Sequence, residues 1–369
     1  MTKGAVIPKK GTTEKAILDF IKEAWEKNCF DSLLIPVEIP SGDSYTYLLI
    51  QDPSLIENAS PLPPITSVQG ARAISSITRK GKVTKRIAAI MRPCEIKAGM
   101  ELHKLEQADL ENVVLISVDC PGALPLSDYV PDSKTGKEKF LKVLKEWGGE
   151  SVRPVCKTCL HFGAELGDLH IAILGDENSI YLIPNSDKGK EMLRSLGISA
   201  EENLPGWDTK ISEIKKKKEE NKKKSEEQLE SEVLGLDRLL ETFSKCIGCH
   251  NCMRACPICY CASCYFDSDN TEHDGTDYVD RAENKGALKF PCDTLFFHLG
   301  RMSHMSLSCL GCGSCEDACP MSIPVAQLFS FVGQKNQELF GYFPGMDKEE
   351  KVPLVVYKEK EFEEFEDSH

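Results

Sequence analysis

One stretch decides what the second half of this chain must form: Cys246-Ile-Gly-Cys249-His-Asn-Cys252-Met-Arg-Ala-Cys256-Pro257. It recurs as Cys309-Leu-Gly-Cys312-Gly-Ser-Cys315-Glu-Asp-Ala-Cys319-Pro320. Both copies have the spacing C-x2-C-x2-C-x3-C-P. Three cysteines at this spacing wrap a tight loop, in which glycines such as Gly248, Gly311 and Gly313 can adopt a positive φ. The fourth cysteine opens a helix and points away from the other three.

This spacing is that of the bacterial two-cluster ferredoxins, in which the fourth cysteine binds the other cluster. The repeat therefore predicts two [4Fe–4S] clusters with crossed ligands. The first set is Cys246, Cys249, Cys252 and Cys319, and the second set is Cys256, Cys309, Cys312 and Cys315. Zinc ribbons carry two CxxC pairs rather than a triple followed by Cys-Pro. Disulfides require no such repeat, so the iron–sulfur interpretation is favoured.

Four cysteines of the N-terminal half form a third set: Cys94, Cys120, Cys156 and Cys159. Residues 87–91 and 113–119 read as buried strands with a helix of about 95–107 between them, which predicts a βαβ unit in a parallel sheet. Cys94 and Cys120 follow these two strands, at the edge where parallel sheets bind ligands. Such a set can hold a third [4Fe–4S] cluster. Buried structural cysteines or a redox dithiol at Cys156 and Cys159 are the alternatives.

Composition limits the class of protein. The chain of 369 residues has 41% hydrophobic and 28% charged residues, a net charge of −13 and 17 cysteines. An acidic chain is not a default nucleic-acid binder, and cysteines in metal-type runs indicate a reducing compartment. We expect a cytoplasmic protein, because no signal sequence appears near Met1 and no apolar stretch is long enough to span a membrane.

The predicted fold class is α/β. Residues 1–210 form an N-terminal domain with a parallel-core sheet, built from a helix over 13–28 and strands at 33–39, 45–50, 87–91, 113–119, 168–175 and 180–184. A charged helical linker follows at 211–242, because glutamates interleave its lysines. A two-cluster ferredoxin-like domain occupies 243–335, with an insert at 257–308, and 336–369 is a tail. We expect the acidic end beyond Pro353 to wrap a partner or to fray.

The insert carries three further cysteines, Cys259, Cys261 and Cys264. They either shield the first cluster as apolar neighbours or contribute to a further metal site. The segment Phe296 to Met305 is predicted to be a helix, and its aromatic and methionine side chains indicate a docking surface.

A basic segment precedes the strand at 87–91. It contains Arg72, Arg79, Lys80, Lys82 and Lys85, and Arg92 follows the strand. One interpretation is a solvated surface. The other is an anion site near the strand ends, where parallel sheets bind ligands. There arginine would bind phosphate as a fork and lysine would steer a carboxylate-bearing ligand.

Several of these stretches together resemble the beta subunits of coenzyme F420-reducing hydrogenase and of F420-dependent formate dehydrogenase. The matching stretches are Pro61-Leu-Pro-Pro64, Arg92-Pro-Cys-Glu-Ile-Lys-Ala98, Cys156-Lys-Thr-Cys159 with Asp168, the run from Lys245 to Cys261, and Phe297-His-Leu-Gly-Arg-Met-Ser-His-Met305. The last two stretches are most similar to the formate dehydrogenase type. The resemblance covers most of the chain.

The resemblance implies an N-terminal FAD-binding domain with its own [4Fe–4S] cluster on the third set. It also implies that FAD exchanges a hydride with coenzyme F420. From the charge of the basic segment, we expect its residues and Arg92 to bind these anions. The chain departs from the hydrogenase type where it has Arg-Pro-Cys-Glu in place of Thr-Pro-Cys-Gln. A nicotinamide or a heterodisulfide-reductase-like partner is therefore an alternative, although the chain has no GxGxxG fingerprint.

The expected function is a flavin iron–sulfur oxidoreductase subunit. FAD splits an electron pair, and the clusters carry single electrons to a catalytic partner such as a formate dehydrogenase alpha-like subunit or a hydrogenase. No residue of the chain is expected to be catalytic by itself. The alternative is an electron-relay subunit without flavin chemistry, and no nucleic-acid partner is expected.

Overall fold

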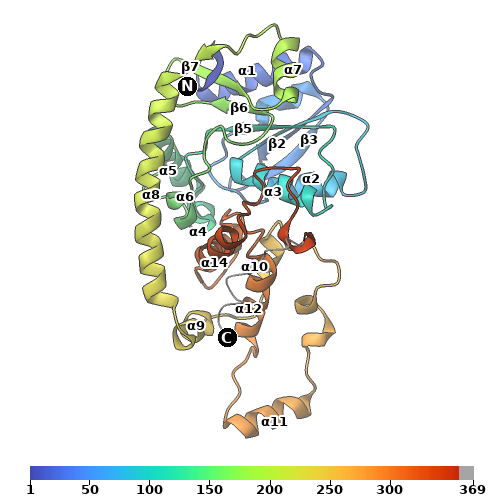
Figure 1. Ribbon diagram of the computed structural model, residues 1–369, viewed down its shortest axis with the longest axis vertical. Coiled ribbons are helices and arrows are strands. Elements are labelled where there is room, and N and C mark those ends of the chain that lie inside the picture. Colours follow the sequence, from blue (N-terminus) through green and yellow to red (C-terminus); the bar gives the residue numbers. More distant parts are fainter. Residues whose placement is uncertain (357–369) are drawn as a thin grey trace.

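The computed structural model describes residues 1–356, and its N-terminal part is built on one eight-stranded sheet (Figure 1). The strand order is β3-β2-β4-β5-β6-β7-β1-β8. The strands are β1 (Lys3–Pro8), β2 (Ser32–Glu38), β3 (Tyr45–Ile50), β4 (Ile87–Met91), β5 (Val113–Val118), β6 (Leu169–Ala172), β7 (Ser179–Pro184) and β8 (Glu202–Asn203). Neighbours from β2 to β6 pair in parallel, and the outer strands pair antiparallel. The predicted parallel core is thus confirmed within a mixed sheet.

Helices cover both faces of this sheet, which explains why its central strands are apolar throughout. All five residues of β4 are buried. Ala88 and Ile90 face a core that includes α1 (Thr13–Glu26) and α7 (Asp187–Ser195). Ala89 and Met91 face the opposite core with α2 (Gly70–Thr78) and α3 (Pro93–Lys104). The alternation follows from the two-residue period of a strand.

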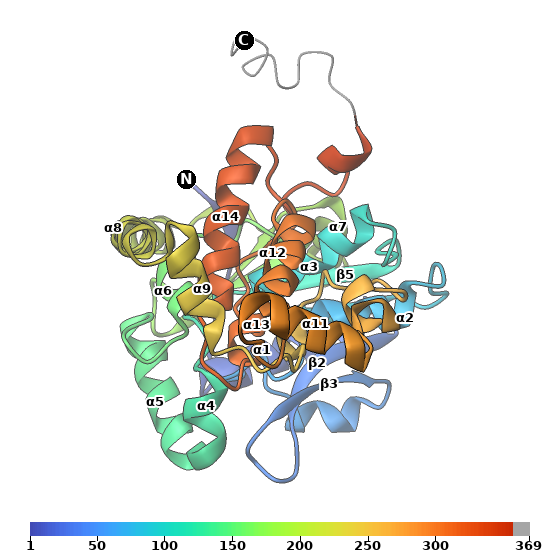
Figure 2. The same ribbon diagram turned by 90° about the horizontal axis from the view of Figure 1, so that it is seen from below.

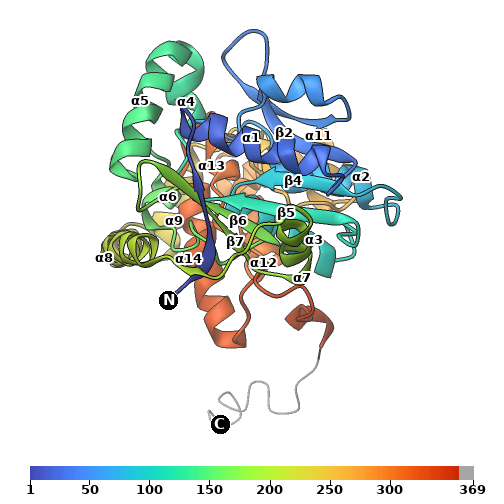
Figure 3. The ribbon, with the colours of Figure 1, turned by 90° about the horizontal axis from the view of Figure 1, so that it is seen from above.

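The connection from β5 to β6 carries three helices: α4 (Leu126–Tyr129), α5 (Ser133–Glu146) and α6 (Pro154–Thr158). Figures 1 and 3 show α5 at the same side of the sheet as the long helix α8 (Pro205–Val233). α8 has 29 residues, most of them charged, and buries only Trp207, Lys218, Leu229 and Val233. It runs alongside the molecule and leads into α9 (Leu236–Ser244).

The cysteine runs lie in the second half, around α10 (Asn251–Ala255), α12 (Thr294–Met305), α13 (Ser314–Asp317) and α14 (Val325–Phe340). Helix α11 (Gly275–Lys285) projects from the rest of the insert (Figure 1), and none of its residues is buried. Figure 2, the view from below, shows α9, α12, α13 and α14 grouped together at this end of the molecule. Short 3-10 turns are η1 (Pro53–Asn58), η2 (Val130–Asp132), η3 (Tyr265–Asp267), η4 (Asp269–Thr271) and η5 (Pro353–Val355).

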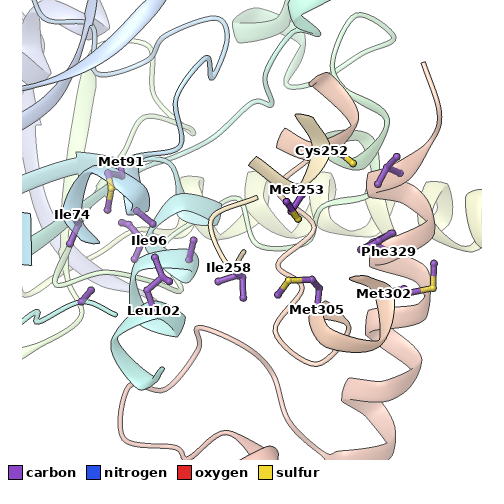
Figure 4. Close-up of a cluster of buried hydrophobic side chains, with 14 of the residues drawn as sticks. Ile74, Met91, Ile96, Leu102, Cys252, Met253, Ile258, Met302, Met305 and Phe329 are labelled. Carbon is purple, nitrogen blue, oxygen red and sulfur yellow. The ribbon is translucent and has the colours of Figure 1, made fainter. Parts of the chain in front are cut away.

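One hydrophobic core joins the two halves. We call the part from α10 to α14 the cysteine module. Figure 4 shows Ile74, Ile96 and Leu102 of the sheet domain on one side, and Met302, Met305 and Phe329 of the cysteine module on the other. Ile258, only 4% exposed, lies between these groups. The cysteine module therefore packs directly on helices α2 and α3, and its connection through the charged helix α8 is not its only contact with the sheet domain.

Several elements differ from the prediction. β1, β8, α2, α5 and α11 were not predicted. Residues 336–340, which were assigned to the tail, continue α14 because Gln337 is buried and donates hydrogen bonds to three backbone carbonyls. The expected partner-wrapping end from 357 onward lies outside the described residues. No described helix is long and apolar enough to cross a membrane.

Candidate iron–sulfur centres

The two cysteine runs form the loops that their spacing predicts. Gly248, Gly311 and Gly313 have φ values of 67°, 63° and 82°, so each occupies the left-handed region that a tight loop requires. The expectation that the fourth cysteine opens a helix is wrong, because Cys256 caps the end of α10 and Cys319 follows the end of α13. Cys256 has an extended backbone, which turns it away from the loop before it. The loop geometry of a two-cluster ferredoxin is therefore present in both copies.

The structure brings Cys256 to the opposite run. A small cavity of about 30 Å³ is lined by Cys256, Cys309, Cys312 and Cys315 together, which are the members of the second set. Burial raises the pKa of the Cys309 thiol to about 12, and the charge of Cys256 adds to this shift. Burial likewise raises the pKa values of Cys312 and Cys315, again with a contribution from Cys256.

The first set is crossed in the same way. Burial raises the pKa of Cys252 to about 11, and Cys319, Cys246 and Cys249 are among the charges that raise it further. Cys319 comes from the second run, yet its charge also raises the pKa of Cys246 in the first run. The grouping of the eight thiols thus follows the crossed pattern rather than the order of the chain.

The third set gathers at the carboxyl ends of the parallel strands. Cys94 opens α3 directly after β4, Cys120 follows β5, and Cys156 lies on α6. Burial raises the pKa of Cys94 well above its usual value, with contributions from Glu95, Cys120, Cys312 and Cys159. Burial also raises the pKa of Cys156, where Cys120 and Cys159 contribute. The four predicted thiols are therefore neighbours, and Cys312 places the second set beside them.

Contacts across the domain boundary support this adjacency. A cavity of about 130 Å³ is lined by Cys159 of the third set and Cys309 of the second, with Lys97 between them. Arg153 donates to the carbonyl of Cys312 at 3.3 Å and forms a buried ion pair with Asp317. Lys218 of α8 donates to the carbonyl of Cys156 at 2.7 Å. Arg153 therefore joins the segment before α6 to the cysteine module, and Lys218 joins the third set to α8.

Buried arginines point directly at thiols. Arg92 is 7% exposed and donates to Sγ of Cys120 at 3.0 Å, to the carbonyl of Gly122 and to that of Pro63. Arg301 is 2% exposed and donates to Sγ of Cys252 at 3.2 Å. His298 lies 3.4 Å from Sγ of Cys246 and stacks on Phe243. A buried cation needs a compensating negative charge, and thiolates that hold a cluster would supply one.

The donor set fits clusters better than single ions. A zinc site brings four ligands around one ion at about 2.0–2.3 Å. A four-iron cluster binds each thiolate to a different iron, so its sulfurs lie farther apart. The thiol-only sets and their arginines fit such a cluster.

The basic residues lie elsewhere than their prediction assumed. Arg79, Lys80, Lys82 and Lys85 lie between α2 and β4, at the amino end of the strand, whereas the argument for an anion site required the carboxyl ends. Lys82 pairs with Glu111 at the surface. Arg72 donates to the carbonyl of Arg254 in the cysteine module, and Arg92 is engaged by the third set. The predicted position of these residues at the ligand-binding edge of the sheet is therefore wrong. Their role in binding anions stays a prediction.

The largest described cavity does not fit a dinucleotide. It measures about 1030 Å³ and lies at the carboxyl end of β2 beside Leu62 and Pro64. Its apolar walls, such as Leu48 and Phe140, suit a flat ring system. Its charged groups are Glu14, Glu38 and Glu57 against a single lysine, Lys137, so they disfavour the pyrophosphate of FAD.

Sequence reasoning missed the residues that support the thiols. Asp119, directly before Cys120, accepts hydrogen bonds from Trp207 of α8 and from two backbone amides, and contacts His170 at 2.8 Å. Ser117 lies 2.6 Å from the other ring nitrogen of His170. All three side chains are fully buried, so no substrate reaches this Ser-His-Asp arrangement and it is structural. The signal in the sequence was that Asp119 directly precedes Cys120, a predicted ligand.

Comparison with known proteins agrees with these centres. Residues 242–323 match the family model of a 4Fe-4S dicluster domain, which includes both runs. The F420-dependent formate dehydrogenase subunit beta of Methanocaldococcus jannaschii is 28% identical over 71% of this chain and 74% of its own length. The F420-dependent formate dehydrogenase 1 subunit beta of Methanococcus maripaludis is 27% identical over 93% of each chain.

The chain is similar to F420-dependent formate dehydrogenase beta subunits. The resemblance predicted from the motifs is therefore confirmed, and these beta-subunit relatives are oxidoreductase subunits by name. The xenon-derivatized F420-reducing [NiFe] hydrogenase complex of Methanosarcina barkeri contains a chain that resembles this one over 64% of this chain and 94% of that one. Its TM-score is 0.47 at 15% identity, too weak a likeness to carry an argument.

Proposed function

We propose that this chain is an electron-transfer subunit of an oxidoreductase complex, with three [4Fe–4S] clusters in series. The observation that carries the proposal is the sequence of contacts among the three cysteine sets. The third set lies at the strand ends, the second set adjoins it through Cys312 and Lys97, and the first set is interleaved with the second through Cys256 and Cys319.

Each cluster would accept one electron, and the protein would tune its potential through burial and hydrogen bonds to its sulfurs. Arg92 and Arg301 donate to sulfurs of the third and first sets. Ser314 lies 3.6 Å from Sγ of Cys312 in the second. The residues of this chain would therefore position the cysteine thiolates, exclude water and stabilise negative charge. None of them makes or breaks a covalent bond of a substrate.

The two-electron partner in this proposal is coenzyme F420, which the names of both beta-subunit relatives contain. A hydride brings two electrons together, whereas a cluster takes one at a time. A flavin supplies the missing step when bound, because it exchanges pairs on one side and single electrons on the other. FAD bound in the N-terminal domain, outside the acidic cavity beside Leu62 and Pro64, is therefore part of the proposal. A formate dehydrogenase catalytic subunit is the proposed partner. In the alternative form of this proposal, the clusters exchange electrons with a heterodisulfide-reductase-like complex.

Anaerobic analysis of iron, sulfide and flavin in the purified complex tests the proposal. Three clusters give about twelve iron atoms per chain, against about eight for two. Flavin released on denaturation, and cluster reduction by reduced F420 but not by NADH, would support the F420 route. Iron without flavin would favour the relay alternative. Full loading at the lower iron content, with a dithiol at Cys156 and Cys159, would exclude the third cluster.

A further inference from the structure

Arg301 is the most deeply buried cation of the cysteine module that makes no ion pair. It lies on α12 with 2% exposure, and no carboxylate among residues 1–356 pairs with it. Its Nε atom is buried without a hydrogen-bond partner in the described chain. The other buried arginine of this region, Arg153, has Asp317 as its counter-charge. An unpaired buried charge costs several kcal/mol, so Arg301 requires another anion.

The surroundings of Arg301 show where that anion must be. Its Nη1 donates to Sγ of Cys252 at 3.2 Å, which belongs to the first set. The same side chain lines the small cavity formed by Cys256, Cys309, Cys312 and Cys315, which is the second set. One guanidinium therefore faces both sets.

The position of the guanidinium is fixed by apolar packing. The rings of Phe297 and Phe329 lie 5.6 and 4.9 Å from its Cζ atom. Nη2 donates to the carbonyl of Cys252 at 3.2 Å and lies 3.9 Å from Sγ of Cys259. Phe297 precedes it on α12 and Phe329 comes from α14, so two helices hold it between the cysteine loops. A lysine would keep the charge but could not reach both sides with one planar fork.

We propose that Arg301 is the shared counter-cation of the first and second clusters, and that it raises the reduction potentials of both. Reduction adds one negative charge to a cluster that is already anionic. A fixed cation stabilises the reduced form more than the oxidised form, and low local dielectric strengthens the effect. Arg301 is thus a positioning residue that keeps the potentials of two adjacent clusters linked. The inference rests on the proposed cluster assignment.

The test compares Arg301→Gln and Arg301→Lys in the full chain, reconstituted anaerobically. Arg254→Gln is the matched control, because Arg254 is largely exposed and pairs with Asp267 on the same module. The measurements are iron content and a redox titration followed by EPR. In Arg301→Gln we expect the reduction equilibria of both clusters to shift at least tenfold toward the oxidised form, about 59 mV for one electron. Arg301→Lys keeps the charge but not the fork, so it should recover only part of the shift. Arg254→Gln should leave both potentials unchanged.

The outcomes separate the two claims. Wild-type protein without four-iron clusters would refute the proposed function. Clusters in the wild type, with unchanged potentials in a fully loaded Arg301→Gln variant, would overturn the role of Arg301 alone. A shift confined to one cluster would overturn the sharing. Loss of iron in both Arg301 variants would mean that the side chain only holds the fold, which also overturns the proposal.

Discussion

A single buried carboxylate, Glu101, anchors the cysteine module to the sheet domain. It lies on α3 and is 0% exposed. It accepts hydrogen bonds from Ser308 at 2.6 Å, from the hydroxyl of Tyr342 at 2.8 Å and from the backbone amide of Gly345 at 3.0 Å. Lys104 pairs with it at 3.1 Å. Ser308 directly precedes Cys309, so this carboxylate also holds the start of the second cysteine loop.

Replacing Tyr342 with Phe removes one donor and leaves the ring packed. Burial raises the pKa of Tyr342, so its hydroxyl remains protonated and donates. A hydrogen bond to a charged group contributes about 1.5–3 kcal/mol to the free energy of unfolding. Glu101→Gln should cost more, about 3–5 kcal/mol, because it leaves Lys104 buried with only the more distant Glu350.

The assay is the rate of unfolding in denaturant, followed by circular dichroism on cluster-loaded protein under anaerobic conditions. A rate is appropriate because loss of a cluster makes unfolding irreversible. Tyr342→Phe should speed unfolding roughly tenfold to a hundredfold if the bond is broken in the transition state, since about 1.4 kcal/mol corresponds to tenfold. Tyr265→Phe is the control, because Tyr265 is 49% exposed.

The double variant tests the coupling. Glu101→Gln with Tyr342→Phe should cost less than the sum of the single changes, because the hydroxyl has lost its charged acceptor. Strict additivity, or a Tyr342→Phe rate equal to that of Tyr265→Phe, would refute the view that Glu101 ties the module down.

Three further predictions follow from particular contacts. Cys256→Ser should damage the cluster of Cys309, Cys312 and Cys315, seen by EPR, and damage limited to the first set would refute the crossed ligation. The pKa of Glu165 is lowered to about 2, chiefly by His161 and despite burial; this stabilisation is complete above about pH 4.5 and is lost as the pH falls toward 2, so acid unfolding should be less steep in Glu165→Gln. Only the outer side of α12 is free, with Phe296 55% and Leu299 40% exposed. Backbone amides there should exchange more slowly when the partner subunit binds, and unchanged exchange would exclude this helix as a docking surface.

The sequence predicted the central fold well where a pattern was strong. Fully apolar strands such as 87–91, ended by Pro93, can only be central strands of a covered sheet, and the structure has β4 there. It missed β1, because its two buried residues Gly4 and Ala5 do not form an alternating pattern. It missed α2 because a basic segment around Arg72 and Arg79 was interpreted as a ligand surface rather than as an amphipathic helix.

The two ferredoxin-like runs could be recognised because the spacing within each run is a local property of the chain, whereas the third set was proposed from predicted strand ends and from the resemblance. Their supporting residues could not, since Arg92 meets Cys120, and Arg301 meets Cys252, only after distant segments pack. The binding role of the basic segment stays a prediction. Its charge and its place before β4 are visible in the sequence, whereas the contact of Arg72 with the cysteine module arises only when distant segments pack.

Helix α3 links these observations physically. It carries Cys94 of the third set in its first turn, Lys97 between the third and second sets, and Glu101 bound to Ser308 of the second loop. An α-helix rises about 1.5 Å per residue, so Cys94 and Glu101 are held roughly 10 Å apart along its axis. Glu101, at one end of this spacer, is buried and hydrogen-bonded, so the distance from Cys94 to the second loop cannot vary without breaking the Glu101 contacts. A change at Glu101 should therefore slow electron transfer between these two clusters even where both remain fully loaded.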